Sequence, residues 1–106
     1  MSDCEFHHFG VPTRANHDGE VYIEAGRVHV TDAASHPYRV EFLRFEPDTL
    51  MPVEVQTRAH VAFIVPDLDA ALDGHDVLIE PFDATEEFRV AFITDGEAVI
   101  ELMERR

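Results

Sequence analysis

Two histidines and two glutamates stand at matching places in two similar stretches of the sequence. His8 opens "HFGV" and His60 opens "HVAF", while Glu41 lies in "VEFL" and Glu101 lies in "IELM". All four stretches have the apolar pattern of β-strands. If the two stretches pack about a pseudo-twofold axis, two imidazoles and two carboxylates converge on one point. That donor set suits a divalent ion such as Zn²⁺, Ni²⁺, Mn²⁺ or Fe²⁺.

The neighbours of these residues favour a buried site. Side chains alternate across a strand, and these four strands are apolar on both faces. A glutamate among apolar neighbours is costly to desolvate unless a cation or a hydrogen-bonding partner meets it. Gly10 and Ala62 each follow a histidine by two residues. Because both are small, they leave room in front of the imidazole rings.

Simpler interpretations of the four residues stay open. A strand histidine is often a satisfied core residue, and a strand glutamate is often paired with an arginine. Alternation along the first strand predicts that His7 points away from His8. His7 is therefore a ligand only if the alternation is off by one residue. Glu104 is the corresponding substitute for Glu101, although alternation places it on the other face.

Strand patterns dominate the elements that must position these residues. Apolar runs bounded by Pro, Gly and Asp predict strands at 5–11, two within 20–32, and others at 38–46, 60–65, 76–82, 87–95 and 98–104. Pro66 and the acidic first turn of "PDLDAALDG" predict a short helix over 66–74 that ends at Gly74. The stretch 47–58 contains two prolines and reads as a linker.

The second half therefore reads β-α-β-β-β, and the first half reads β-loop-β-β-β. From histidine to glutamate is 33 residues in the first half and 41 in the second, and the eight missing residues fall where the helix is missing. We interpret this pattern as an internal repeat. It predicts a single α+β domain over 1–106, with a first module at 5–46, a linker at 47–58 and a second module at 59–106.

Composition narrows the function classes. The net charge is −14 and all eight basic residues are arginine, a balance that repels nucleic acid and anionic membranes. No apolar run reaches the ~20 residues of a membrane span, and the first residues lack the pattern of a signal peptide. The single cysteine, Cys4, excludes an internal disulfide and fits a reducing compartment. We therefore expect a cytoplasmic protein without nucleic-acid or membrane partners.

These motifs resemble the vicinal oxygen chelate superfamily, which includes glyoxalase I, bleomycin-resistance proteins and extradiol dioxygenases. "HVAFIVPDLDAAL" is similar to the first strand and helix of such a module, and "FRVAFITDGEAVIELME" to its closing hairpin. The first half is similar only through "HFGVP" and "YRVEFLRF". The resemblance implies two βαβββ modules, the first with its helix reduced or absent, that form a cup-shaped, glyoxalase-like mixed sheet. It also implies four metal ligands: His8, Glu41, His60 and Glu101.

The resemblance further implies a divalent-metal-dependent lyase or isomerase of the glyoxalase I type, or a related enzyme acting on a small oxygenated molecule. In such an enzyme Glu101 or Glu41 serves as the catalytic group, because a ligand carboxylate that leaves the ion can move a proton. The alternative is a metal-free protein of the bleomycin-resistance type, which binds a small molecule without chemistry. A small structural domain is the third possibility.

Because the first module lacks a helix, we expect something else to cover one apolar face of its sheet. In the second module the helix can cover the outer side chains of its strands. The equivalent residues of the first module have no such cover: Phe9, Val11, Val40 and Phe42. An exposed apolar face of this kind marks an interaction site. We expect either a homodimer that buries it or the segment 50–55 folded across it.

Overall fold

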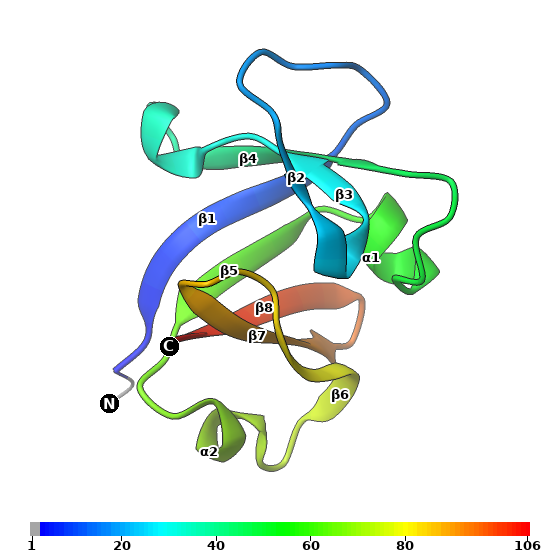
Figure 1. The fold of residues 1–106 in the computed structure, drawn as a ribbon. Coiled ribbons are helices and arrows are strands. Elements are labelled where there is room, and N and C mark those ends of the chain that lie inside the picture. Colours follow the sequence, from blue (N-terminus) through cyan, green and yellow to red (C-terminus); the bar gives the residue numbers. More distant parts are fainter. Residues whose placement is uncertain (1–2) are drawn as a thin grey trace.

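The computed structural model describes residues 3–106 and consists of one eight-stranded mixed sheet with two short α-helices (Figure 1). The strands are β1 (Glu5–Pro12), β2 (Val21–Ile23), β3 (Val28–Val30), β4 (Val40–Phe45), β5 (His60–Ile64), β6 (Asp76–Asp83), β7 (Phe88–Asp95) and β8 (Ala98–Arg105). Their order in the sheet is β2-β3-β4-β1-β5-β8-β7-β6. The sheet curls into a half-barrel, and we call its concave face the cup. The predicted α+β class and the cup-shaped mixed sheet are confirmed.

The sheet repeats one arrangement of four strands. β1 runs parallel to β4 and β5 runs parallel to β8, so the order β1-β4-β3-β2 recurs as β5-β8-β7-β6. β1 and β5 pair antiparallel at the centre of the sheet. This pairing is the one that a pseudo-twofold axis produces. It sets the two histidine-bearing strands side by side.

Helix α2 (Leu68–Leu72) lies outside the second half of the sheet, as predicted (Figure 1). Asp67 begins it by accepting a hydrogen bond from a backbone N–H of the first turn. Leu68 is fully buried in the core beneath it. The equivalent segment of the first half, residues 13–20, is a loop. Both α-helices have five residues, and none within 3–106 has the length and hydropathy to cross a membrane.

Helix α1 (Val53–Thr57) lies inside the segment 47–58, where the sequence predicts only a linker. Val55 is buried in the core of the cup, together with residues of β5, β7 and β8. Met51 packs against the same core. The linker therefore packs on the concave side, because its apolar residues find partners there. The expectation that 50–55 folds across the outer face is wrong.

The outer face of the first half is only partly covered. The ring of His17, from the loop after β1, stacks on Phe42 with ring centroids 4.1 Å apart. Phe9 and Phe6 are each 44 % exposed, and Phe6 lies edge-on to Phe63. These rings are the ones that the expected homodimer would bury. The homodimer stays a prediction.

Apolar side chains pack on both faces of the second half. On the outer face, Leu68 and its neighbours in α2 pack against alternate residues of β7 and β8. On the concave face, the other residues of these strands form the larger core with α1 and β5. The alternation predicted for β5 and β8 therefore holds. It turns His60 and Glu101 into the cup.

Candidate metal centre

The four predicted ligands lie around the seam between β1 and β5: His8, Glu41, His60 and Glu101. Gly10 lies opposite His60 across the seam, and Ala62 lies opposite His8. The same two small residues pair with the two glutamates on the parallel strands β4 and β8. The internal repeat thus places each histidine opposite a small residue. Each small residue in turn lies beside a glutamate.

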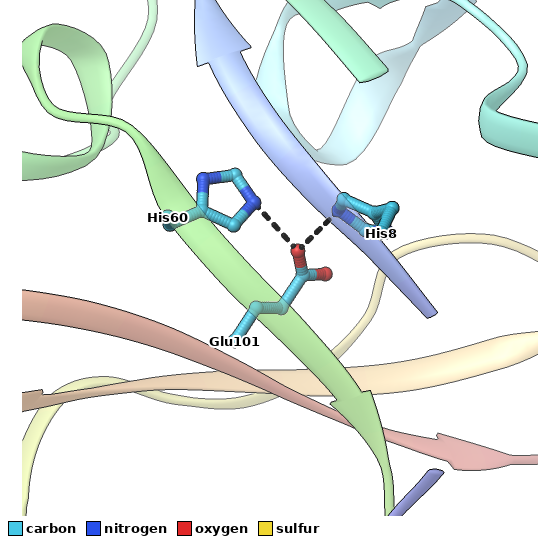
Figure 2. Close-up of side chains that lie close together, drawn as sticks. All are labelled: His8, His60 and Glu101. Carbon is cyan, nitrogen blue, oxygen red and sulfur yellow. Dashed lines mark hydrogen bonds and ion pairs between the residues drawn. The ribbon is translucent and has the colours of Figure 1, made fainter. Parts of the chain in front are cut away.

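Three of the four form a buried cluster (Figure 2). His60 Nε2 donates a hydrogen bond to Glu101 Oε1 at 3.0 Å, and His8 Nε2 lies 3.3 Å from the same oxygen. His8 and His60 are each 2 % exposed, and Glu101 is 8 % exposed. One ligand atom from each of the three lies within 4.8 Å of the other two. Among the described residues, this group has the composition and spacing to hold a metal ion.

Glu41 stands at the side of this cluster. Its Oε1 lies 3.4 Å from His8 Nε2, but Glu41 is not in the group whose atoms lie within 4.8 Å of one another. Its side chain is 17 % exposed and lines the cavity that opens from the site. The structure therefore brings His8, His60 and Glu101 together and places Glu41 against His8 alone.

The donor set and its spacing fit a divalent ion. A tetrahedral ion with bonds of about 2.0–2.1 Å holds its ligand atoms roughly 3.3 Å apart. The two histidine nitrogens lie 3.0 and 3.3 Å from Glu101 Oε1. His8 Nε2 gives a second observation, because it is buried and makes no hydrogen bond within residues 3–106. A buried polar atom without a hydrogen bond is costly, and an ion at this point would satisfy it.

The two glutamates differ in their electrostatics. Burial alone raises the pKa of Glu101, but its contacts with His60 and His8 outweigh burial and lower the pKa to about 2. Burial raises the pKa of Glu41 to about 7, against the opposing effect of His8. Burial lowers the pKa of His8, yet the nearby Glu101 and Glu41 leave it raised overall. Glu101 therefore stays ionised, as a ligand does, whereas Glu41 changes its protonation near neutral pH.

Gly10 leaves the space that the His60 ring fills. A Cβ added to Gly10 would lie 2.2 Å from His60 Cε1 and 2.5 Å from His60 Nε2. The rings of His8 and Phe92 enclose His60 further, each with its centroid 5.4 Å away. The imidazole is therefore held in one place, with its Nε2 directed at Glu101.

His7, which the sequence offers only as an alternative ligand, is a residue of the site. The register of β1 shifts between Phe6 and His8, and this β-bulge puts His7 on the concave side as well. The prediction that His7 points away from His8 is therefore wrong. The Nδ1 atoms of the two histidines are 2.7 Å apart, so one donates a hydrogen bond to the other. When His8 is the donor, its Nε2 carries the lone pair that a metal ion needs.

A cavity of about 580 Å³ opens beside the cluster, within the usual size range for small-molecule sites. His8, Glu41 and Glu101 line it together with residues of both halves of the sheet. A smaller apolar pocket of about 60 Å³ also touches the two glutamates and is walled by residues such as Val55 and Phe92. The cluster thus lies between an apolar interior and an open cavity.

Comparison with known proteins identifies the fold but no close relative. No family model matches the chain, and no curated protein matches it. The hypothetical protein BH1468 from Bacillus halodurans C-125 matches with a TM-score of 0.68 and 14 % identity, over 98 % of this chain and 96 % of that one. Methylmalonyl-CoA epimerase from Mycobacterium tuberculosis, a vicinal oxygen chelate protein, matches with a TM-score of 0.63 and 18 % identity, over 95 % and 87 %.

This is the vicinal oxygen chelate fold. The likeness covers nearly the whole of this chain and of both solved structures, so it includes the first half, where the sequence resemblance is weak. At these identities the likeness concerns the fold, and one fold supports many reactions. The chemistry of this protein must therefore be argued from the cluster and its cavity.

Proposed function

We propose that the protein is a divalent-metal-dependent enzyme, a lyase or isomerase that acts on a small oxygenated molecule in the cup. The observation that carries the proposal is the buried cluster of His8, His60 and Glu101, in which two nitrogens, His8 Nε2 and His60 Nδ1, lack a hydrogen bond. The cavity beside it is large enough for such a molecule. The neighbour named methylmalonyl-CoA epimerase supports an isomerase on this fold.

His8, His60 and Glu101 would hold the ion through two imidazole nitrogens and one carboxylate oxygen. This set suits Zn²⁺, Ni²⁺, Mn²⁺ or Fe²⁺. When bound, the ion acts as a Lewis acid that stabilises negative charge on substrate oxygens. His7 would hold the His8 ring in orientation through the contact between their Nδ1 atoms.

Glu41 is the residue to which we assign proton transfer. It lines the open cavity and contacts His8, whereas Glu101 is held between two imidazoles. A partly desolvated carboxylate is a stronger base than a solvated one. Glu41 would take a proton from the bound molecule and return it at another atom. The sequence alone leaves proton transfer open to either Glu41 or Glu101, and we assign it to Glu41.

Metal analysis of protein purified without an affinity tag tests the proposal. We expect about one divalent ion per chain in the wild type and a small fraction of that in His60→Ala. His75→Ala removes an exposed histidine from the turn after α2 and is the matched control, which should keep the ion. Wild-type protein with less than ~0.2 ion per chain, and no gain on reconstitution, contradicts the metal proposal.

A second candidate is metal-free binding of a small molecule, of the bleomycin-resistance type. The hydrogen bond from His60 to Glu101 favours it, because the bond satisfies part of the cluster without an ion. The two candidates differ in the His60→Ala variant. If the protein binds small molecules without metal, the wild type contains no metal and His60→Ala binds small molecules in the cup as tightly as the wild type does.

Assembly and location complete the proposal. We propose a homodimer, supported by the exposed rings of Phe6 and Phe9 on the outer face of the sheet. A cytoplasmic setting is supported by the single cysteine of the sequence. The strongly negative charge supports the absence of nucleic-acid and anionic-membrane partners.

A further inference from the structure

Among the described residues that line the cavity beside the cluster, five carry carboxylates and none is an arginine or lysine, while most of the others are apolar. The acidic lining residues are Asp32, Glu41, Glu86, Glu87 and Glu101. Glu101 is buried at the inner end, whereas Glu86 and Glu87 are exposed in the turn between β6 and β7. Asp32 comes from the other half of the chain, in the segment between β3 and β4. Carboxylates from both halves thus surround the same space.

Local hydrogen bonds hold the Asp32 carboxylate and the backbone that carries Glu86 and Glu87. Asp32 accepts hydrogen bonds from a backbone N–H and a serine hydroxyl of the short turn that follows it. In the turn that carries Glu86 and Glu87, Thr85 Oγ1 accepts hydrogen bonds from two backbone N–H groups. Because the backbone around these charges is ordered before anything binds, a ligand pays little conformational entropy to meet them.

The arginines that could offset this charge are engaged elsewhere. Arg39 is close to the site, but its Nε donates to the backbone carbonyl of His7, and Arg39 does not line the cavity. Other arginines pair with carboxylates outside the cavity: Arg27 with Asp48, Arg44 with Glu20, Arg89 with Glu104, Arg105 with Glu5, and Arg106 with Asp83. Among the described residues, no arginine therefore lines the cavity to meet a phosphate or carboxylate.

A divalent ion in the cluster would leave the net charge of the cavity negative. Five carboxylates line the cavity, and the pKa of one of them, Glu41, is about 7, so two to three negative charges remain after the two charges of the ion are subtracted. We propose that the cup takes a small cationic molecule, whose positive group lies among Asp32, Glu86 and Glu87 while its oxygen atoms face the cluster. The metal contact rests on the proposed function, whereas the preference for positive charge rests on the lining residues.

One further observation points to a ligand at the inner end of the cavity. His8 Nε2 is a buried nitrogen without a hydrogen bond, and His8 lines the same cavity, so a hydrogen-bonding group of a ligand can meet it there. An acyl-CoA carries several phosphates and is the opposite kind of ligand. The substrate of this protein therefore differs in charge from the one in the name of the epimerase neighbour.

Three catechols that share a chelating group and differ in charge test the proposal: dopamine, which is positive, 4-methylcatechol, which is neutral, and 3,4-dihydroxyphenylacetate, which is negative. Their affinities are measured by calorimetry with the metal-loaded and the metal-free protein. We expect dopamine to bind on the order of tenfold more tightly than the negative catechol at low salt, with a smaller ratio at high salt. The double variant E86Q/E87Q should lose most of this preference. The control E80Q/E97Q removes two exposed carboxylates outside the cavity and should keep it.

The outcomes separate the two proposals. Equal binding of the three catechols, tighter binding of the negative one, or equal ratios in the two double variants overturns the cationic ligand. If 4-methylcatechol binds equally with and without metal while dopamine keeps its advantage, the metal-dependent function fails and the cationic preference stands. If no catechol binds to either form of the protein, both proposals are overturned.

Discussion

Replacing Gly10 by alanine tests whether the space in front of His60 is what positions the cluster. The added Cβ would lie 2.2 Å from His60 Cε1, so the ring must move by roughly 1.2 Å to reach an ordinary carbon contact of about 3.4 Å. His60 has no free direction to move, because its side chain is fully buried and the rings of His8 and Phe92 enclose it. Overpacking of this kind costs about 1–3 kcal/mol.

The expected net effect is smaller than the steric cost. Alanine lowers the entropy of the unfolded chain relative to glycine, which returns about 0.4–1 kcal/mol. We therefore expect Gly10→Ala to lower the free energy of unfolding by roughly 1–2 kcal/mol, or the melting temperature by about 5–10 °C. Metal affinity should fall by more than about tenfold, since ligand distances tolerate only ~0.2 Å. Urea and thermal denaturation and a metal competition assay give the three values.

A double-mutant cycle decides whether the His60 ring is the cause. In a His60→Ala background the ring is gone, so Gly10→Ala should cost nothing or stabilise. Gly26→Ala is the control. Its added Cβ would lie 3.1 Å from Val28 Cγ1 and 3.3 Å from the flexible end of Met51, so shifts of a few tenths of an ångström relieve both contacts. Equal destabilisation by Gly10→Ala in both backgrounds would show that the His60 ring is not the cause.

Three other predictions concern protonation, orientation and assembly. The pKa of Glu41 is about 7 in the folded protein, above its value near 4.5 in the unfolded chain, so the cost of ionising it grows as pH rises from 4.5 to 7. As the pH rises from 4.5 to 8, the free energy of unfolding of Glu41→Gln should therefore increase by about 3 kcal/mol relative to that of the metal-free wild type, as measured by urea denaturation. A difference that does not change with pH would contradict this. His7→Ala should weaken metal binding by about 10–100-fold in a competition assay, while unchanged affinity would mean that His7 does not orient His8. Phe9→Arg should convert a dimer into a monomer in size-exclusion chromatography with light scattering, and a wild type that is already monomeric at micromolar concentration refutes the dimer.

The internal repeat made the central geometry predictable. Alternation along β5 and β8 assigns His60 and Glu101 to one face, and the structure agrees. The repeat then transfers the same relation to His8 and Glu41, although the first half matches the second in few residues. A small residue two positions after each histidine is also readable from the sequence, because the pattern H-x-G and H-x-A recurs.

Alternation failed where the strand is irregular. The β-bulge between Phe6 and His8 has no residue signature of its own, and it turns His7 into the cup. Helix α1 was missed for a related reason. A five-residue helix is too short to be stable through propensity, so its existence depends on the packing of Val55 in the cup, which local sequence does not reveal.

The different roles of the two glutamates were not predictable from sequence. Both occupy equivalent places in the repeat, and both pair with a small residue of the central strands. Glu101 lies between two imidazoles, whereas Glu41 reaches His8 and faces the cavity. This asymmetry arises from tertiary packing around the seam. It shifts the pKa values of the two carboxyl groups in opposite directions, which is the basis for the different roles that we propose for them.

Anomalous diffraction from crystals of the untagged protein, collected at the absorption edge of the metal it contains, tests the central claim most directly. We expect one strong peak within about 2.3 Å of His8 Nε2, His60 Nε2 and a carboxylate oxygen of Glu101. A cluster without a peak after reconstitution, with the His60–Glu101 hydrogen bond still in place, would contradict it. Peaks confined to surface histidines such as His75 would contradict it equally.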